Sequence, residues 1–322
     1  MTPGMALEMI DVARHYGDVV AVRDVTLRVR AGEILCVLGP NGAGKTTTVK
    51  MASTLLAPTS GTIRVGGVDA VRNPRKARAH LGLALGGDRG FYMRATVLDN
   101  LRFFAELKGA GGRRRDSSIQ ETLDRLGLGD KATKRVEELS RGMRQRLHIA
   151  RALIGEPALI LLDEPSSGLD PENAKGLRDL VATLRSNGAA ILLTTHHMQE
   201  AEELANRIVV LDRGTVAVEG TTATIAEAAG ITQVSTFRAS SVPAEFVTRI
   251  ASDTVGVIDV LAEERNGAWT IDVMWSVPSA DNESILQILG GSASHIVTRA
   301  ATLEEAYLGY LERRRSRVAA QS

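Results

Sequence analysis

The chain of 322 residues has one cysteine, few aromatic side chains and no long apolar run. Cys36 has no partner for an internal disulfide, which fits a reducing compartment such as the cytoplasm. Aromatic residues make up only 3%, so we expect cores built from Ala, Val, Leu and Ile. No apolar stretch approaches the ~18–20 residues needed to span a bilayer, and Met1–Ile10 lacks the features of a signal peptide.

The chain also lacks a strong net charge and a pattern of metal ligands. A formal net charge of +1 argues against bulk nucleic-acid binding, for which a strongly basic domain is typical. The six histidines and one cysteine are scattered, which disfavours a zinc site. With 44% hydrophobic residues and a mean hydropathy of −0.02, the chain is expected to be soluble and globular. Its length suits two domains.

The clearest motif is Gly39–Thr46, which reads G-x-x-x-x-G-K-T. It follows the apolar run Ile34–Leu38 and precedes a segment that can start a helix. Glycines let successive backbone N–H groups point at phosphate oxygens, and the following helix adds its positive N-terminus. We therefore predict a nucleoside triphosphate site in which Lys45 reaches the β- and γ-phosphates and the Thr46 hydroxyl binds Mg²⁺.

Polar residues follow two later apolar segments, where they can share one edge of a parallel sheet. Asp163 and Glu164 end the apolar run Leu153–Leu162, and His196 stands after the next predicted strand. Active sites of open α/β sheets gather at the carboxyl ends of strands. We therefore expect Asp163 to hold Mg²⁺ opposite Thr46, and Glu164 to act as a general base toward water. His196 is expected to contact the γ-phosphate or that water.

Residues 1–225 are predicted to form an α/β P-loop NTPase core with two additions. Leu7–Ala13 and Val19–Val29 alternate as strands of an antiparallel β subdomain. The segment Thr96–Leu128 follows a helical period, which indicates a helical insert at about residues 90–150. Ser140 is a natural N-cap for a further helix.

Residues 226–322 are expected to form a smaller accessory domain. The predicted elements are strand Val234–Arg238, helix Ala244–Ile250, strands Val255–Ala262 and Trp269–Met274, helix Glu283–Leu289 and strand His295–Thr298. This β-α-β-β-α-β order predicts a ferredoxin-like α+β fold. A last helix is predicted over Leu303–Arg314, and it ends in the basic run Arg313–Arg317. We interpret this run as a solvated helix end; the alternative is that it binds anionic lipid headgroups.

Together these motifs resemble the ATP-binding subunit of ABC transporters over roughly residues 5–220. The matching segments are Walker A at Gly39–Thr46, the signature at Leu139–Gln145, Walker B at Leu159–Glu164, the D-loop at Ser167–Asp170 and the switch histidine in Thr195–His196. The signature ahead of Walker B distinguishes this family from other P-loop proteins. The segment Thr302–Leu308 is similar to the C-terminal segment of export-type subunits such as the daunorubicin-resistance ATPases.

The resemblance implies a role for each matching residue. Tyr16 would stack on adenine, Ser140 and Gly142 would contact the ATP of a second subunit, and Asp170 would tune that dimer contact. The catalytic residues would be Lys45, Glu164 and His196, and Mg²⁺ would be held by Thr46 and Asp163. The phosphates would be held by Gly39, Pro40, Asn41, Gly42, Ala43, Gly44, Lys45, Thr46 and Thr47.

Two positions depart from the family's pattern. Arg141 stands where the signature usually has a second glycine after the serine, although Gly142 remains. The family also places a glutamine after the strand Leu81–Leu85, where it touches Mg²⁺ and links the site to the membrane partner. This chain has Gly86–Asp88 there, and the aspartate can replace the glutamine as a metal or water contact.

The resemblance implies a cytoplasmic ATPase, peripheral on the inner face of the cell membrane, that binds ATP and Mg²⁺. It would dimerise on ATP, naturally as a homodimer, and power export through a separate integral membrane transporter subunit, with no nucleic-acid partner. Two alternatives stay open: an importer ATPase with a regulatory C-terminal domain, and a soluble ABC ATPase outside transport. A ligand effect that requires residues 230–322 would favour the first, whereas a single cassette without heptads disfavours the second. The membrane partner would select the transported substrate.

Overall fold

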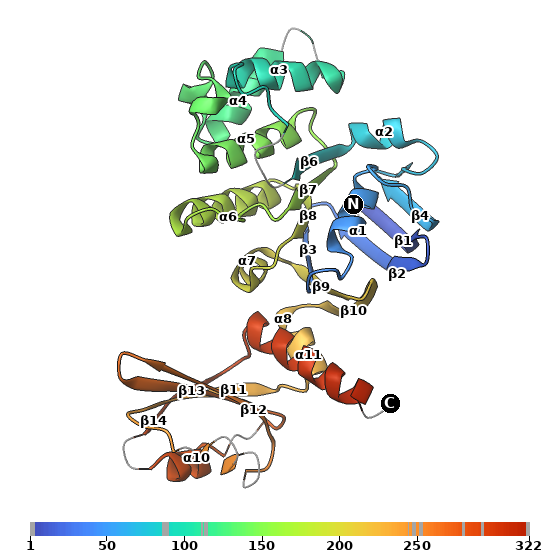
Figure 1. The fold of residues 1–322 in the computed structure, drawn as a ribbon. Helices are drawn as coiled ribbons and strands as arrows, with labels where there is room; N and C mark the ends of the chain where they lie inside the picture. The colour runs from blue at the N-terminus through green and yellow to red at the C-terminus, as the bar shows by residue number, and fades with distance from the viewer. Residues whose placement is uncertain are drawn as a thin grey trace. The chain divides into compact units, whose positions relative to one another are not determined.

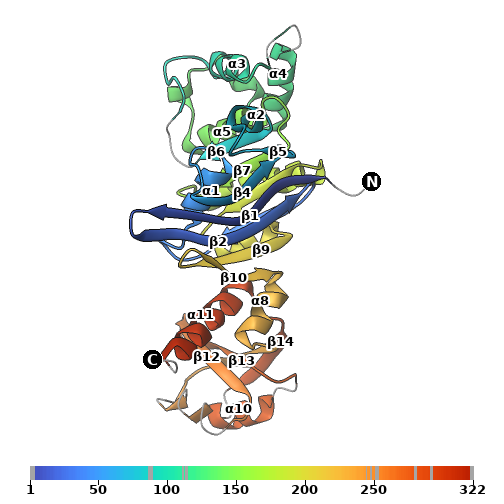
Figure 2. The ribbon, with the colours of Figure 1, turned by 90° about the vertical axis from the view of Figure 1, so that its right-hand side faces the viewer.

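The computed structural model describes residues 4–85, 90–110, 112, 115–243, 245–246, 249–250, 254–278, 281–290 and 293–319. The chain divides into two compact units, Met1–Ala217 and Val218–Ser322 (Figures 1 and 2). The division falls a few residues before the expected boundary at 225. The Thr- and Ala-rich segment near that boundary forms a helix, α8 (Thr222–Ala229), which packs on the C-terminal helix α11 (Leu303–Ala319).

Among its described residues, the first unit contains two sheets, seven α-helices and two short 3-10 helices, Gly129–Lys131 and Val136–Glu138. Its strands are β1 (Met5–Tyr16), β2 (Val19–Arg30), β3 (Ile34–Leu38), β4 (Ser60–Val65), β5 (Val68–Asp69), β6 (Leu81–Leu85), β7 (Leu159–Asp163), β8 (Ala190–Thr194), β9 (Arg207–Asp212) and β10 (Thr215–Gly220). Its helices are α1 (Lys45–Ala52), α2 (Pro74–Ala79), α3 (Val97–Leu107), α4 (Arg115–Arg125), α5 (Arg141–Leu153), α6 (Pro171–Ser186) and α7 (Met198–Leu204).

The larger sheet has the strand order β10-β9-β3-β8-β7-β6. Strand β3 pairs in parallel with β8 and β9, and β7 pairs in parallel with β8 and β6. All five residues of β3 are buried, as a continuous apolar run in a covered parallel sheet should be. Because β3, β7 and β8 run in the same direction, the residues that follow them meet at one edge of the sheet.

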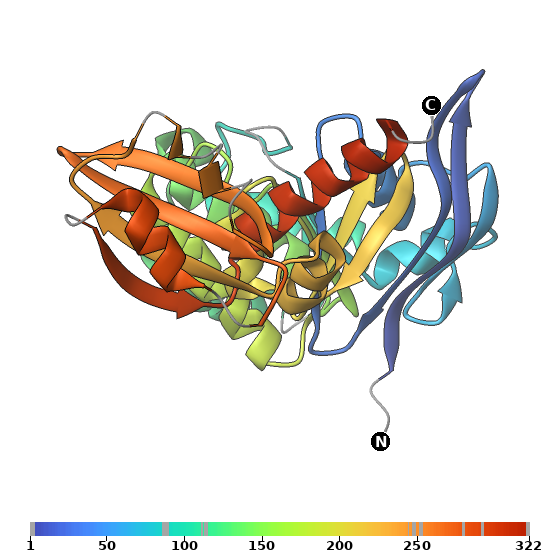
Figure 3. The same ribbon diagram turned by 90° about the horizontal axis from the view of Figure 1, so that it is seen from below.

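The smaller sheet, ordered β2-β1-β4-β5, packs against the larger one. Its long strands β1 and β2 pair antiparallel and lie side by side (dark blue in Figure 3). Buried side chains of β1, such as Leu7 and Met9, share one hydrophobic core with Leu35 and Val37 of β3. Burying each such side chain contributes about 1.5–3 kcal/mol, so this core fixes the smaller sheet over the central strand.

The helical insert consists of α3, α4 and α5. The start predicted for the strand after α5 was wrong. Ser140 caps α5 as predicted, because its side chain accepts a hydrogen bond from the Met143 N–H. The predicted strand Leu153–Leu162 is too long: α5 continues to Leu153, and the strand begins only at Leu159, after a turn through Gly155 and Pro157. The segment after the Gly-rich loop forms a helix as expected, α1, which ends at Ala52.

The second unit is an α+β structure around one sheet. Its further elements are β11 (Gln233–Ala239), β12 (Val257–Arg265), β13 (Ala268–Trp275), α10 (Asn282–Leu289) and β14 (Ser294–Arg299). The strand order is β12-β13-β11-β14, and the pairs β12–β13, β13–β11 and β11–β14 are all antiparallel. Figure 1 shows α10 on one face of this sheet and α8 with α11 on the other. The predicted helix Ala244–Ile250 lies partly outside the described residues.

Phe237, Ile271 and Trp275 form the core of this unit with Ile285 and Leu289 of α10. The Trp275 indole N–H donates to the Ser235 hydroxyl at 3.1 Å, which satisfies its only polar group inside the protein. In the part of the chain that the structure describes, no helix is both long and apolar enough to cross a membrane.

Candidate ATP site

The Gly-rich loop connects the buried end of β3 to the first turn of α1. Gly39 has φ +153°, and a Cβ at this position would lie 2.3 Å from the Leu211 carbonyl oxygen. Only glycine lets the chain pass this strand so closely. The loop residues Asn41–Thr47 line a cavity of about 190 Å³, together with Ala21 of β2 and Glu164. The structure therefore brings Glu164 to the predicted phosphate-binding loop.

Lys45 lies at the start of α1 and is 8% exposed. Its Nζ donates to the carbonyl oxygens of Gly39 at 2.6 Å and Pro40 at 3.2 Å. Burial lowers the pKa of the Lys45 ammonium, and the nearby carboxylates of Glu164 and Asp163 oppose that shift. The ammonium is thus held inside the loop, within the electrostatic reach of the two acids predicted for the site.

Asp163 is the last residue of β7 and Glu164 follows it, next to the end of β8. The Thr194 hydroxyl donates to Asp163 Oδ1, and the Glu164 backbone N–H donates to the Thr194 carbonyl oxygen at 2.9 Å. Thr194 is fully buried. The sequence analysis assigned no role to Thr194, although a hydroxyl next to the Walker B strand was the available signal. Thr194 holds the Asp163 carboxylate and the Glu164 backbone in place.

Glu164 has a left-handed backbone conformation, with φ +47°. A non-glycine residue in this region stores strain, and such strain is concentrated at functional sites. His196 Nδ1 lies 3.3 Å from Glu164 Oε1, and about half of the His196 side chain is exposed. The strand before His196 is parallel to that of Asp163, as predicted. The His197 ring lies against that of His196, with the ring centres 4.1 Å apart.

A second cluster joins the signature and D-loop segments. Ser140 caps α5 and Asp170 caps α6, and Asp170 accepts from both the backbone N–H and the side-chain amide of Asn173. These hydrogen bonds lower the pKa of Asp170. A Cβ at Gly142 would lie 2.5 Å from Asn173 Oδ1, so Gly142 allows α5 to approach this side chain closely. None of these residues lines the cavity at the Gly-rich loop.

One predicted contact does not reach that cavity, and another lies outside the described residues. Tyr16, which the resemblance places on adenine, is the last residue of β1, and it is 47% exposed. The Arg14 guanidinium lies 4.7 Å from its ring centre, and Tyr16 does not line the loop cavity. Gly86–Asp88, the segment where the family's glutamine is missing, lies outside the described residues.

The arrangement offers few ligands for a metal. Among the described residues, no group of three or more His, Cys, Asp or Glu side chains could hold a metal ion. Thr46 is exposed at the loop and Asp163 stands at the end of β7, so both supply oxygen donors. Mg²⁺ commonly binds one or two protein oxygens and takes its other ligands from water and substrate phosphates. The residues present therefore fit Mg²⁺ bound together with a nucleotide.

The comparisons with known proteins identify the family. A family model described as ABC transporter matches residues 22–167. The chain is 37% identical to the ABC transporter ATP-binding protein NatA of Bacillus subtilis, over 66% of this chain and 89% of NatA. It is 38% identical to the daunorubicin/doxorubicin resistance ATP-binding protein DrrA of Streptomyces peucetius, over 71% and 69% of the two chains. The chain belongs to the ATP-binding proteins of ABC transporters.

Further relatives and solved structures agree with this assignment. A Nod factor export ATP-binding protein of Paraburkholderia xenovorans is 39% identical, over 68% of this chain and 71% of the relative. A solved ATP-binding subunit of an ABC transporter superposes with a TM-score of 0.62 at 30% identity, covering 69% of this chain and 92% of that one. The predicted export-type ABC ATPase is confirmed, and with it the α/β P-loop fold with an antiparallel β subdomain.

Proposed function

We propose that this chain binds ATP in the cavity of the Gly-rich loop and hydrolyses it with Glu164 as the general base. The supporting observation is that Glu164 lines this cavity, next to His196 and within the electrostatic reach of Lys45. Lys45 would exchange its contacts with the loop carbonyls for the β- and γ-phosphates. Glu164 would accept the proton of the attacking water, and His196 would orient that water or the γ-phosphate.

Mg²⁺ would be held by the Thr46 hydroxyl and the Asp163 carboxylate. When bound, the ion would neutralise part of the charge on the phosphate oxygens. Thr194 would keep Asp163 Oδ1 fixed through its hydrogen bond and leave the second carboxylate oxygen for the ion. Adenine would stack on the face of Tyr16 opposite to Arg14.

The variant Glu164→Gln tests the assignment of the base. We expect it to bind ATP with the affinity of the unchanged chain, and to lose turnover by about a hundredfold or more. Glu172→Gln, on the first turn of α6, is the matched control and should hydrolyse ATP normally. Nucleotide affinity is measured with a fluorescent ATP analogue and turnover by phosphate release. Turnover retained in Glu164→Gln would remove this residue from the mechanism.

The second cluster supports an active dimer of two identical chains. Ser140 and Gly142 lie apart from the loop cavity of their own chain, so in our proposal they contact the nucleotide of a partner. A relative solved as a dimer bound to ADP and Pi, at 25% identity and a TM-score of 0.59, supports this arrangement. Sedimentation of Glu164→Gln should give dimers with ATP and monomers with ADP. A monomer under both conditions would contradict the proposal.

An apolar groove of about 340 Å³ in the first unit is the proposed contact for the membrane subunit. Leu107, 68% exposed, and Leu55, 58% exposed, lie along this groove. Its described lining also holds Arg78, Lys108 and Arg151 and no carboxylate. Burial, and to a smaller extent the positive charge of Arg151, lowers the pKa of Lys108 to about 8. An amphipathic segment with apolar and acidic side chains matches this lining.

A charge reversal tests this docking. Arg78→Glu should abolish co-purification with a multi-span membrane protein from gently solubilised membranes of the native cell. Arg75→Glu changes an exposed residue of the same helix that does not line the groove, and it should leave co-purification intact. Equal loss in both variants would point to a general charge effect instead. Recovery of the unchanged chain with soluble partners alone would contradict a transport role.

We further infer that the second unit is ferredoxin-like and that the protein acts on the inner face of the cell membrane. The strand order β12-β13-β11-β14 places the first and third strands at the centre, which is what two interleaved β-α-β units require. The export relatives named above support a peripheral position beside a membrane subunit. In this proposal that subunit selects the exported substrate.

A further inference from the structure

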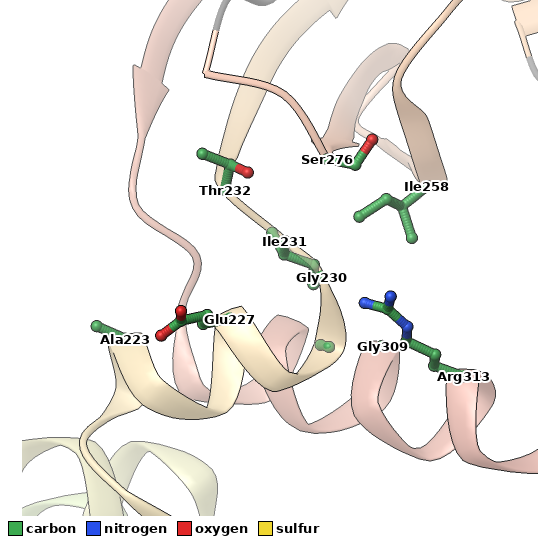
Figure 4. A pocket seen from close by; sticks show the side chains of 10 residues that line it. Ala223, Glu227, Gly230, Ile231, Thr232, Ile258, Ser276, Gly309 and Arg313 are labelled. Carbon is green, nitrogen blue, oxygen red and sulfur yellow. The ribbon is translucent and has the colours of Figure 1, made fainter.

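The second unit contains a pocket of about 940 Å³ that no role of the ATPase uses. It lies where the C-terminal end of α8, the start of β11 and the middle of α11 meet (Figure 4). Its volume is at the upper end of the range of about 300–1,000 Å³ typical of small-molecule sites. All of its described lining residues belong to the second unit.

Arg313 of α11 supplies the pocket with a cation. Its guanidinium lies against the bare backbone of Gly230, where an ideal Cβ would be 1.9 Å from Nη1. Gly230 ends α8 in a left-handed conformation, with φ +77°. Figure 4 shows the guanidinium directed toward Gly230 and the pocket interior. Arg313 is exposed, and no ion pair joins it to another residue that the structure describes.

The remaining lining combines apolar and hydroxyl groups. Ile258 of β12, 39% exposed, is drawn beside Arg313, and the buried Ile231 lies deeper at the start of β11. Thr232 and Ser276 also line the pocket; in Figure 4 Ser276 lies beside Ile258, and its hydroxyl donates to the Gly256 carbonyl oxygen at 3.0 Å. Glu227 lines the pocket at the end away from Arg313 (Figure 4). The cation therefore stands next to apolar surface, and Glu227, the one acidic residue in the described lining, is remote from it.

We propose that this pocket binds an amphiphilic organic anion, with its acidic group on Arg313 and its apolar part on Ile258 and Ile231. A guanidinium forms paired, charge-assisted hydrogen bonds with a carboxylate or a similar acid. Removing the apolar part of the ligand from water supplies the rest of the affinity. The proposal does not depend on ATP hydrolysis, so it can be tested in the full chain without nucleotide.

Three ligands with the same ten-carbon tail separate the contribution of charge from that of the apolar part. In isothermal titration, decanoate should bind saturably with one molecule per chain. Decanol should bind at least about tenfold more weakly, because it offers no charge to Arg313. Decylammonium should also bind weakly. Equal binding of all three, or tighter binding of decylammonium through Glu227, would overturn the proposal.

Variants locate the ligand within the chain. Arg313→Met should weaken decanoate binding about tenfold or more, and Ile258→Ser several-fold. Arg265→Met is the matched control, because this exposed arginine pairs with Glu263 and does not line the pocket. Thermal unfolding checks that each variant is folded. Arg313→Lys keeps the charge, so its affinity for decanoate should lie between that of the unchanged chain and that of Arg313→Met. Unchanged affinity in folded Arg313→Met would contradict the assignment.

A membrane lipid and a free amphiphile present the same chemistry, and vesicles distinguish them. The pocket is proposed for a free molecule, so vesicles of anionic phosphatidylglycerol should not sediment the chain through Arg313. Under the same conditions, isothermal titration should still show saturable binding of decanoate to the chain. The contrary outcome is that the chain binds no decanoate but sediments with the vesicles, and that Arg313→Met loses this sedimentation while Arg265→Met keeps it. That result would assign the pocket to lipid headgroups and overturn the proposal for a free ligand.

Discussion

The Arg141 guanidinium donates a hydrogen bond of 3.1 Å to the Ser167 carbonyl oxygen. This contact joins the first residue of α5, in the signature segment, to the D-loop segment that follows β7. A Cβ at Gly168 would lie 2.3 Å from Arg141 Nη2, so the guanidinium lies directly on the bare backbone there. The residue that departs from the signature pattern of the family thus connects the two segments assigned to one dimer contact.

Loss of this connection should lower turnover without changing nucleotide affinity. Arg141→Gly restores the residue usual in the family but removes the bridge to Ser167, so we expect ATP hydrolysis to fall several-fold. Arg141 does not line the loop cavity, so the affinity of the isolated subunit for a fluorescent ATP analogue should stay the same. Arg141→Lys keeps the charge, so its rate of ATP hydrolysis should lie between those of the unchanged chain and Arg141→Gly. Full activity in Arg141→Gly would mean that the bridge is dispensable.

The Thr194 hydroxyl should be required for the orientation of Asp163. Thr194→Val keeps the approximate shape of the buried side chain and removes the donor to Asp163 Oδ1. We expect a loss of about 1–3 kcal/mol in the free energy of unfolding, because a buried hydrogen bond is broken. We also expect a higher Mg²⁺ concentration for half-maximal hydrolysis. Thr194→Ser keeps the hydroxyl and should restore the Mg²⁺ response; an unchanged response in Thr194→Val would contradict the assignment.

The sequence predicted the parts of the site that depend on local motifs. The Gly-rich loop after an apolar strand, the acids after β7 and the histidine after β8 all follow from strand ends in a parallel sheet. The N-cap at Ser140 was equally predictable, because a cap depends on residues three positions apart.

Contacts between distant segments could not be predicted in the same way. The pairing of Thr194 with Asp163 depends on the register of β7 and β8, and the Arg141 bridge depends on where α5 meets the D-loop. Helix α8 was missed because its Thr- and Ala-rich sequence looks like a linker. Its helical form is supported by the Thr221 cap and by packing on α11.

The close approach at Gly39 predicts a strong effect of one methyl group. Gly39→Ala would place Cβ 2.3 Å from the Leu211 carbonyl oxygen, so the loop must move away from β9. We expect a lower melting temperature and at least about tenfold weaker ATP binding, because the backbone N–H groups would no longer converge. At Gly42 nothing lies within 4 Å of the added Cβ, so Gly42→Ala should cost only about 1–2 kcal/mol of backbone strain. Equal losses of melting temperature and ATP affinity in Gly39→Ala and Gly42→Ala would argue against the steric explanation.

The stability of the second unit should depend on Glu305 at acidic pH. Glu305 is 6% exposed and accepts hydrogen bonds from both terminal nitrogens of Arg299, at 2.7 and 2.8 Å. Burial alone would raise the pKa of Glu305, but the hydrogen bonds from Arg299 and the Thr302 N–H outweigh it and lower the pKa below its ordinary value of 4.5. The ionised carboxylate therefore connects β14 to the start of α11.

Because the folded-state pKa lies below the unfolded value, this contribution is fully present above about pH 4.5 and is lost as the pH falls through the lowered pKa. Glu305→Gln should cost about 1–3 kcal/mol at pH 7 and show a weaker loss of stability on acidification. Both tryptophans, Trp269 and Trp275, lie in β13, so denaturant unfolding followed by tryptophan fluorescence reports on this unit alone. Glu304→Gln, at an exposed neighbour, should behave like the unchanged chain. A parallel pH dependence in Glu305→Gln would show that other groups control the acid stability.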